Sequence, residues 1–200
     1  MSDYNIFLPK FSREVLTDSL AFLEKMDVTC EVSPKFNAGQ KPPYETPMHL
    51  AITCPRLKKW PLGERKILTA LKLKVVLFDF KELEERQKPG FNNLFGLIRK
   101  SDSVLDVKRL RDNRDDQFFS QLKSFKREVR ITEDDDAFAS NLFTPMFAVA
   151  LTLAGNGLIY EGEFFDKGSV KRDFWPSTDE VEEIKEDLDD GGVPVFFDRW

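Results

Sequence analysis

The chain has 200 residues, of which 41% are hydrophobic and 12% are aromatic, and 19 of them are Phe. This composition excludes a disordered chain and is enough for a sizeable core in one large domain. The net charge of −5 disfavours a general affinity for nucleic acid.

The charge is divided unevenly along the chain. Residues 131–200 hold 17 acidic and five basic side chains, a net charge of −12, whereas residues 1–130 carry +7. A negative face of this kind attracts a basic partner, and an ordinary solvated surface is the alternative. The C-terminal third is therefore a candidate interaction surface.

The first 80 residues predict strands that alternate with helices. Ser12 is placed to cap a helix that carries Leu16, Leu20 and Leu23 on one face. A Pro-rich loop is expected over 34–47 and a short helix over 62–71. Strands are expected over 4–9, 28–33, 48–55 and 73–80.

The middle of the chain is rich in charge and gives weaker patterns. Residues 81–93 are expected to form a charged turn region, and 94–115 has no clear periodicity. A helix is expected over 116–128, with Phe118, Leu122 and Phe125 on one face. A strand is expected over 128–132.

Residues 137–165 predict a buried helix, a cap and a strand. The helix is expected over 137–154, with a kink or a broken start near Thr144 because Pro145 lies inside it. The sequence Gly155-Asn156-Gly157 favours a left-handed helix cap and lacks the spacing of a phosphate-binding loop. The strand LIYEGEFF is expected at 158–165. The apolar stretch is too short and too interrupted to cross a bilayer.

The C-terminal segment predicts one more helix and a strand. Ser177 and Glu180 form a capping box before an apolar stripe, and a strand is expected at 193–197. The pattern favours an α+β fold with one domain over 1–200, a mixed or mostly antiparallel sheet, and helices packed mainly on one face. A subdivision near 90–115 stays open.

Few side chains suggest catalysis. His49 is the single histidine, and it has neither a recognisable nucleophile motif nor the partners of a typical zinc site. The contiguous acids at 133–136 do not match a calcium loop. Glu161 and Glu163 could form a carboxylate pair on one side of a strand. No catalytic residue, metal ligand or cofactor is predicted, although a carboxylate-dependent or metal-dependent enzyme stays open.

Two other features bear on the location and the partner. Cys30 and Cys54 make neither a disulfide framework nor a metal cluster, and no signal peptide is expected at the N-terminus, so the sequence predicts a cytoplasmic protein. Basic residues gather at 108–114 and 123–130 with Phe118, Phe119 and Phe125 among them, but interspersed acids make nucleic-acid binding the weaker interpretation.

The stretch GLIYEGEFF, with the Ala-rich helix before it and FWPSTDEVEEI after it, resembles bacterial α+β immunity proteins of polymorphic-toxin and secretion-system loci. The likeness covers residues 137–184, and this chain has Glu161 where those families usually carry Asp. The resemblance implies a small cytoplasmic protein that binds and neutralises a cognate toxin, and it implies no enzyme. The alternative is another regulatory protein, from a phage or a defence system, that binds a different protein.

Acidic side chains would speed association with a basic toxin, and exposed aromatic side chains would anchor it. The candidate partner-binding residues are Glu161, Glu163, Phe165, Trp175, Glu182, Glu183, Glu186 and Asp187.

Overall fold

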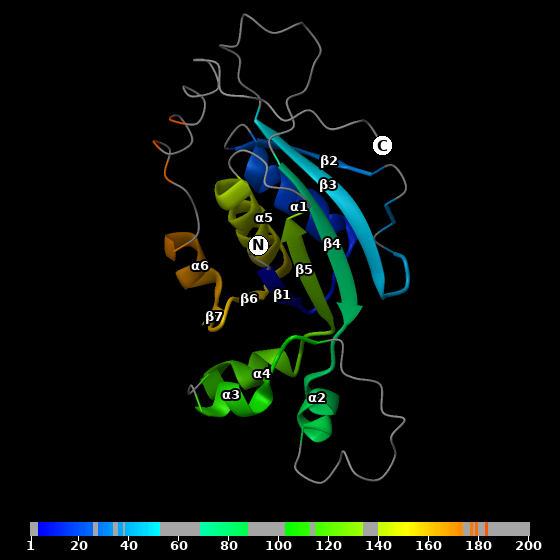
Figure 1. The fold of residues 1–200 in the computed structure, drawn as a ribbon, viewed down its shortest axis with the longest axis vertical. Helices are drawn as coiled ribbons and strands as arrows, with labels where there is room; N and C mark the ends of the chain where they lie inside the picture. The colour runs from blue at the N-terminus through cyan, green and yellow to red at the C-terminus, as the bar shows by residue number, and fades with distance from the viewer. Residues whose placement is uncertain are drawn as a thin grey trace, which may run out of the picture.

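The structure is a computed structural model that describes residues 4–25, 28–33, 36–37, 39–52, 69–87, 103–112, 115–133 and 140–173, with Ser177, Asp179 and Glu183. These residues form an α+β fold around one seven-stranded sheet (Figure 1). The strand order is β2-β3-β4-β5-β1-β6-β7, and every neighbouring pair is antiparallel. The predicted fold class is confirmed.

The sheet and its helices have the following bounds. The strands are β1 (Tyr4–Leu8), β2 (Val28–Val32), β3 (Tyr44–Ile52), β4 (Thr69–Leu77), β5 (Arg127–Glu133), β6 (Leu158–Tyr160) and β7 (Phe164–Phe165). The helices are α1 (Arg13–Glu24), α2 (Phe80–Arg86), α3 (Val107–Asp112), the 3-10 helix η2 (Asp115–Phe118), α4 (Phe119–Leu122), α5 (Ser140–Gly155) and α6 (Lys167–Asp173).

Strand β1 lies inside the sheet between β5 and β6, and all five of its residues are buried. Because successive side chains of a strand point to opposite faces, Ile6 and Leu8 enter one core cluster and Phe7 enters the other. The sheet is therefore covered by apolar side chains on both faces where β1 lies.

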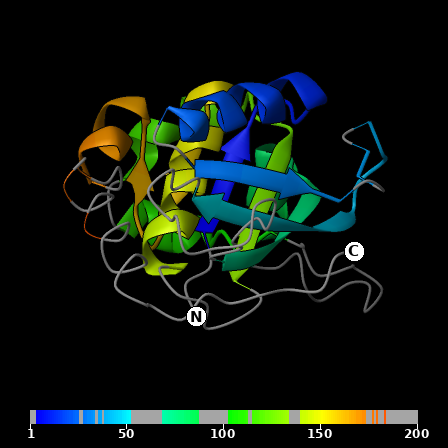
Figure 2. The same cartoon turned by 90° about the horizontal axis from the view of Figure 1, so that it is seen from above.

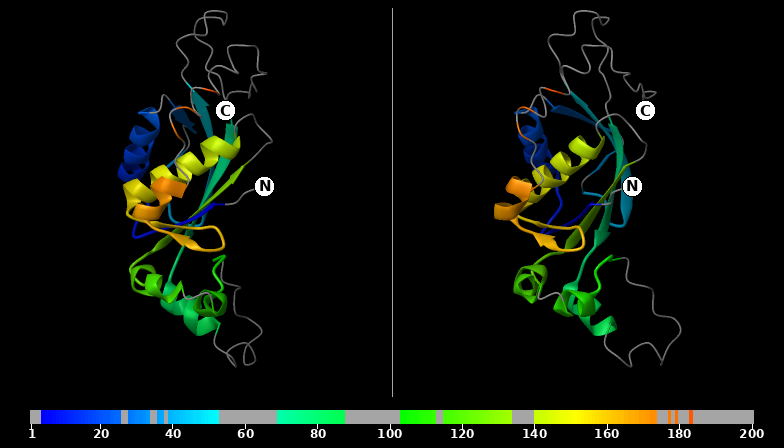
Figure 3. Two further views of the ribbon diagram at one scale, coloured as in Figure 1. Left: turned by 90° about the vertical axis from the view of Figure 1, so that its left-hand side faces the viewer. Right: turned by 60° about the vertical axis from the view of Figure 1, so that its left-hand side comes forward.

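The first core cluster lies between the sheet and the two longest helices. Helices α1 and α5 pack against each other on the same side of the strands (Figures 2 and 3). Helix α1 begins where predicted, because the Ser12 hydroxyl accepts a hydrogen bond from the Val15 N–H at 3.4 Å. Phe143 and Phe147 of α5 are fully buried in this cluster with Leu71 and Leu73 of β4.

The second core cluster includes Phe7 and side chains of the short helices α2, α3 and α4, which gather at one end of the sheet (Figure 1). Helices α1 and α5 lie on one face of the sheet, as expected. The short helices α2, α3 and α4 do not follow that expectation, because their buried side chains belong to the second cluster. The members of the second cluster are Phe7, Phe78, Phe80, Leu83, Leu105, Val107, Leu110, Leu122, Phe125, Leu158, Tyr160 and Phe164.

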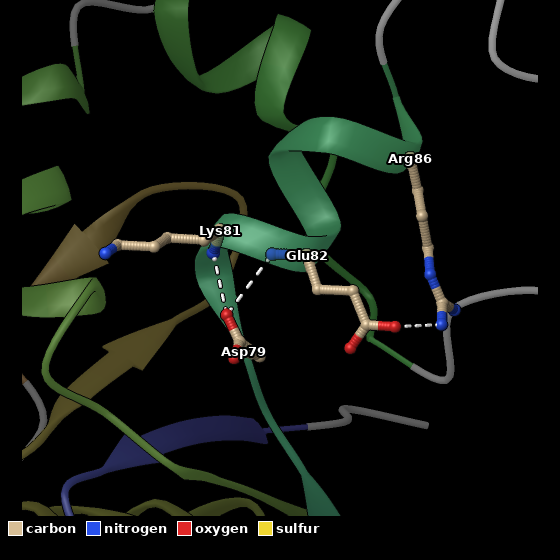
Figure 4. A network of polar contacts seen from close by, with 4 residues as sticks. All are labelled: Asp79, Lys81, Glu82 and Arg86. Carbon is tan, nitrogen blue, oxygen red and sulfur yellow. Dashed lines mark hydrogen bonds and ion pairs between the residues drawn. The ribbon is translucent and has the colours of Figure 1, made fainter.

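Helix α2 corrects the expectation of a charged turn at 81–93. A carboxylate oxygen of Asp79 accepts hydrogen bonds from the N–H groups of Lys81 at 3.0 Å and Glu82 at 3.2 Å (Figure 4). Glu82 also forms an ion pair with Arg86 one turn later. Phe80 and Leu83 are buried, so two apolar residues within a charged run are enough to pack one face of a helix. Residues 88–93 lie outside the described part.

Strands β3 and β4 both begin earlier than predicted. The prediction of a helix over 62–71 is wrong for residues 69–71, which belong to β4. The alternate residues Leu71, Leu73 and Val75 of this strand are buried in the first cluster. Residues 62–68 lie outside the described part. Strand β3 runs through Pro47, where a loop was expected. Pro47 lies opposite Lys72 of β4, whereas β2 pairs with β3 only from Met48 onward, so the missing N–H of Pro47 interrupts no ladder on the β2 side.

Helix α5 ends as the sequence predicts. Asn156 has a φ of 54°, and the Gly157 N–H donates to the Thr152 carbonyl at 2.9 Å, which is the bond of a left-handed helix cap. The helix continues through Pro145, and residues 137–139 lie outside the described part. No helix that the structure describes has the length and apolar character that crossing a membrane requires.

The other predicted elements are confirmed in part. Strand β5 agrees with the expected 128–132, but the helix expected at 116–128 is shorter: η2 and α4 end at Leu122. Phe125 is nevertheless buried in the second cluster. The last predicted helix has only Asp179 and Glu183 among the described residues, both helical, and the strand at 193–197 lies outside them.

Candidate protein-binding site

The turn between β6 and β7 presents two predicted binding residues to solvent. Residues 158–165 form a hairpin and not the single strand expected from LIYEGEFF. The chain reverses because Gly162 adopts a φ of 84°, which glycine tolerates without strain, and the Glu161 N–H donates to the Glu163 carbonyl at 3.1 Å. Glu161 and Glu163 are both exposed.

Aromatic side chains hold this hairpin in place. Phe164 is buried, and its ring centroid lies 5.0 Å from that of Tyr160 and 5.3 Å from that of Phe118 in η2. Phe165 is half-buried and packs against the first cluster. The two glutamates are thus carried by a turn whose flanking residues are fixed in the core.

A second chain segment adds carboxylates near the turn. Asp115 is only 9% exposed, and its Oδ2 has no hydrogen-bond partner among the described residues. Burial raises the pKa of Asp115, and the nearby charges of Glu163 and Asp116 raise it further. We call Asp115, Asp116 and Glu163 the acidic cluster. Glu161 is exposed, but the surrounding chain removes part of its hydration, and this partial desolvation raises its pKa.

Tyr160 belongs to the second core cluster with Val107 and Leu110 of α3. Burial raises the pKa of the Tyr160 hydroxyl, the positive charge of Arg109 lowers it, and Asp115 and Asp106 raise it. The pKa of Tyr160 therefore depends on charged residues of both η2 and the α3 region.

Replacing Asp115 with Asn is expected to stabilise the protein at neutral pH. Because the folded-state pKa is raised, Asp115 contributes stability below its ordinary pKa of 3.8 and loses that contribution as pH rises through the folded-state value. The variant should therefore melt at a higher temperature than the native chain at neutral pH, and the difference should vanish in acid. Thermal unfolding at a series of pH values checks this. The exposed Asp116→Asn is the control, and an equal gain there would contradict the role of burial.

The structure brings together some of the predicted partner-binding residues. Glu161, Glu163 and Phe165 share one hairpin, and Glu183 is exposed in a helical conformation. The other predicted residues, Trp175, Glu182, Glu186 and Asp187, lie outside the described residues.

Sequence reasoning missed the contribution of η2. Asp115, Asp116 and Phe118 lie in a segment whose basic neighbours made it look like a candidate nucleic-acid surface. In the sequence, only the adjacent acids Asp115 and Asp116 indicate a negatively charged surface in this segment. No local pattern in the sequence connects these two residues with Glu163.

His49 lies far from the glutamates of the turn. It is on β3, opposite Glu31 of β2 and Ala70 of β4, whereas β6 is four strands away across the sheet. At the usual strand spacing this separation is about 19 Å, so His49 and the glutamates do not share a site. The described His, Cys, Asp and Glu residues form no group of three that could hold a metal ion.

Several residues of the basic segments have structural contacts. Arg111 forms an ion pair with Glu84 of α2, and its guanidinium lies 5.8 Å from the centroid of the Phe119 ring. Phe125 is buried, and Phe118 and Phe119 are half-buried against the second cluster. These contacts favour a packing role for the interleaved Phe residues.

No protein-family model matches this chain, and neither a characterised protein nor a solved structure is significantly similar to it. The likeness of residues 137–184 to immunity proteins therefore stays a hypothesis.

Proposed function

We propose that this chain is a cytoplasmic binding protein that neutralises a basic partner protein, and specifically an immunity protein that blocks a cognate bacterial toxin. The observation that carries the proposal is the exposed pair Glu161 and Glu163 on a turn held by buried aromatic side chains. A rigid turn presents its charges with little loss of conformational entropy on binding.

The surrounding charge supports the same function. Asp115 and Asp116 come from a separate segment and add to the negative potential at the turn. The repulsion between these carboxylates opposes folding, and groups with perturbed pKa values gather at functional sites more often than elsewhere. A basic partner would relieve the repulsion when it binds.

The test is capture of the partner from the native host with the full-length chain, followed by mass spectrometry. We expect one stoichiometric partner that inhibits growth when it is expressed alone. The double variant Glu161→Lys with Glu163→Lys should slow association roughly tenfold or more at low salt, because the steering charge is reversed.

A matched control is the double variant Glu14→Lys with Asp18→Lys, which reverses two exposed acids on α1. It should capture the partner as the native chain does. Equal loss in both double variants would show that net charge, and not the turn, governs binding. A stoichiometric partner that is harmless when expressed alone would support the regulatory alternative over the immunity protein.

A further inference from the structure

The short helices α2, α3 and α4 belong to one insertion between two paired strands. Strands β4 and β5 are antiparallel neighbours, and their ladder ends at the pair Leu77 and Arg127. The Phe78 N–H donates a hydrogen bond to the Lys126 carbonyl at 3.1 Å, so the chain leaves and re-enters the sheet at one point. We call the described residues of this insertion, 79–87, 103–112 and 115–125, the helical module (Figures 1 and 3). A change within the module therefore does not require the β4–β5 ladder to break.

Contacts within the helical module join its segments to one another. The Oε1 atom of Gln87 accepts a hydrogen bond from the Val107 N–H at 2.7 Å, and its Nε2 donates to the Leu105 carbonyl at 2.9 Å. The ring centroids of Phe80 in α2 and Phe119 in α4 lie 5.0 Å apart. The backbones of α3 and α4 both pack against η2. Because these contacts depend on one another, the module has the properties of one cooperative unit.

The helical module docks on the sheet through side chains, and none of its described residues pairs with a strand of the sheet. The sheet contributes Phe7, Leu158, Tyr160 and Phe164 to the second cluster. The ring centroid of Phe164 lies 5.3 Å from that of Phe118 in η2. Helix α5, in contrast, packs against α1 and against the strands β1, β4, β5 and β6. Separating the module from the sheet therefore leaves the ladders of the sheet and the first cluster intact.

We propose that the helical module opens as one cooperative unit while the sheet, α1 and α5 stay folded. Local opening of this kind occurs where fewer contacts hold a segment than hold the rest of the protein. Opening withdraws Phe118 from Phe164, which directly follows Glu163 of the β6–β7 turn. The equilibrium between docked and open module is therefore a conformational device beside that turn. The inference goes beyond the proposed function, and its test needs no partner protein.

The experiment is native-state hydrogen exchange of the full-length chain, followed amide by amide at several low concentrations of urea. Each protected amide then reports the opening reaction that exposes it. We expect the protected amides of α2, α3 and α4 to share one opening reaction with one dependence on urea. They should exchange roughly 100-fold faster than the most protected amides of β1, β5 and α5, because the module opens without complete unfolding.

Two matched variants distinguish a separate unit from a single cooperative protein. Phe118 of the module and Phe22 of α1 are both half-buried, against the second and the first cluster respectively. The contacts of Phe22 persist when the module opens, so Phe22→Ala should speed exchange in β1, β5 and α5 and leave the module amides unchanged. The contacts of Phe118 are lost in both module opening and complete unfolding. Phe118→Ala should therefore speed both sets of amides by about tenfold, through the lost ring contact and ring burial.

Two results would overturn the proposal. One is equal acceleration of the module and sheet amides by Phe22→Ala, which is the behaviour of a single cooperative unit. The other is exchange of α2, α3 and α4 through unrelated openings, each with its own dependence on urea. If Phe118→Ala does not fold, Phe118→Leu removes the ring, keeps an apolar side chain and allows the same comparison. Neither result depends on whether the chain captures a partner, so the inference and the proposed function can fail separately.

Discussion

The variant Arg130→Ala is expected to lower the free energy of unfolding by about 3–5 kcal/mol, because it leaves a buried charge without its partner. Glu128 is fully buried, and one of its carboxylate oxygens accepts a hydrogen bond from Arg130 Nε at 2.7 Å. The same oxygen accepts from the Val104 N–H at 3.4 Å. Both side chains project from β5, and Glu128 lies opposite Phe7 of β1.

Urea unfolding of three proteins tests this expectation: the native chain, Arg130→Ala, and the double variant Glu128→Leu with Arg130→Met. Replacing both members of a buried ion pair with apolar groups of similar volume is often neutral or stabilising. The double variant should therefore recover most of the lost stability. If it is as unstable as Arg130→Ala, the loss reflects packing and not an uncompensated charge.

The variant Gly157→Ala is expected to destabilise the protein by about 1–3 kcal/mol through steric overlap. A Cβ at this position would lie 2.5 Å from Leu8 Cδ2 and 2.5 Å from the Phe7 carbonyl oxygen. Leu8 could turn aside, but Phe7 belongs to β1, whose backbone is held by β5 and β6 on both sides. The overlap must then move the end of α5 or the start of β6.

The control for this variant is Gly168→Ala. The nearest contact of its Cβ would be Asp166 Oδ1 at 3.4 Å, an ordinary van der Waals distance. Gly168 lies in α6, where Ala is favoured over Gly by as much as about 1 kcal/mol. Thermal unfolding should therefore show a loss for Gly157→Ala and no loss for Gly168→Ala. Similar behaviour of the two variants would refute the steric argument.

The acidic cluster connects stability with function. Asp115→Asn is expected to stabilise the chain, and the loss of one negative charge from the acidic cluster is expected to slow association with a basic partner. Such opposite effects are common where binding requires an arrangement that is unfavourable in the unbound protein. Measuring both quantities on this one variant decides whether the repulsion has a role in binding.

The elements that local sequence determines were predicted best. Helix α1 begins at a serine that satisfies its first turn, and α5 ends where Asn156 takes a left-handed conformation. In both places the hydrogen-bond partners lie within a few residues, so their pattern is visible in the sequence. The exposed acids of the turn, Glu161 and Glu163, were also found from sequence, although their hairpin was not.

Contacts between distant segments decided the rest. Strand β4 has residues that also suit a helix, and its pairing with β3 and β5 overrides that preference. Helix α2 depends on burying Phe80 and Leu83 beside α3 and α4. The packing of Phe118 on Phe164 joins the segment of Asp115 to the hairpin of Glu163, and the charge of Glu163 raises the pKa of Asp115. Sequence alone therefore determined the acidic balance and the helix ends, whereas tertiary packing brought the carboxylates and aromatic rings together, because burial acts between residues far apart in the chain.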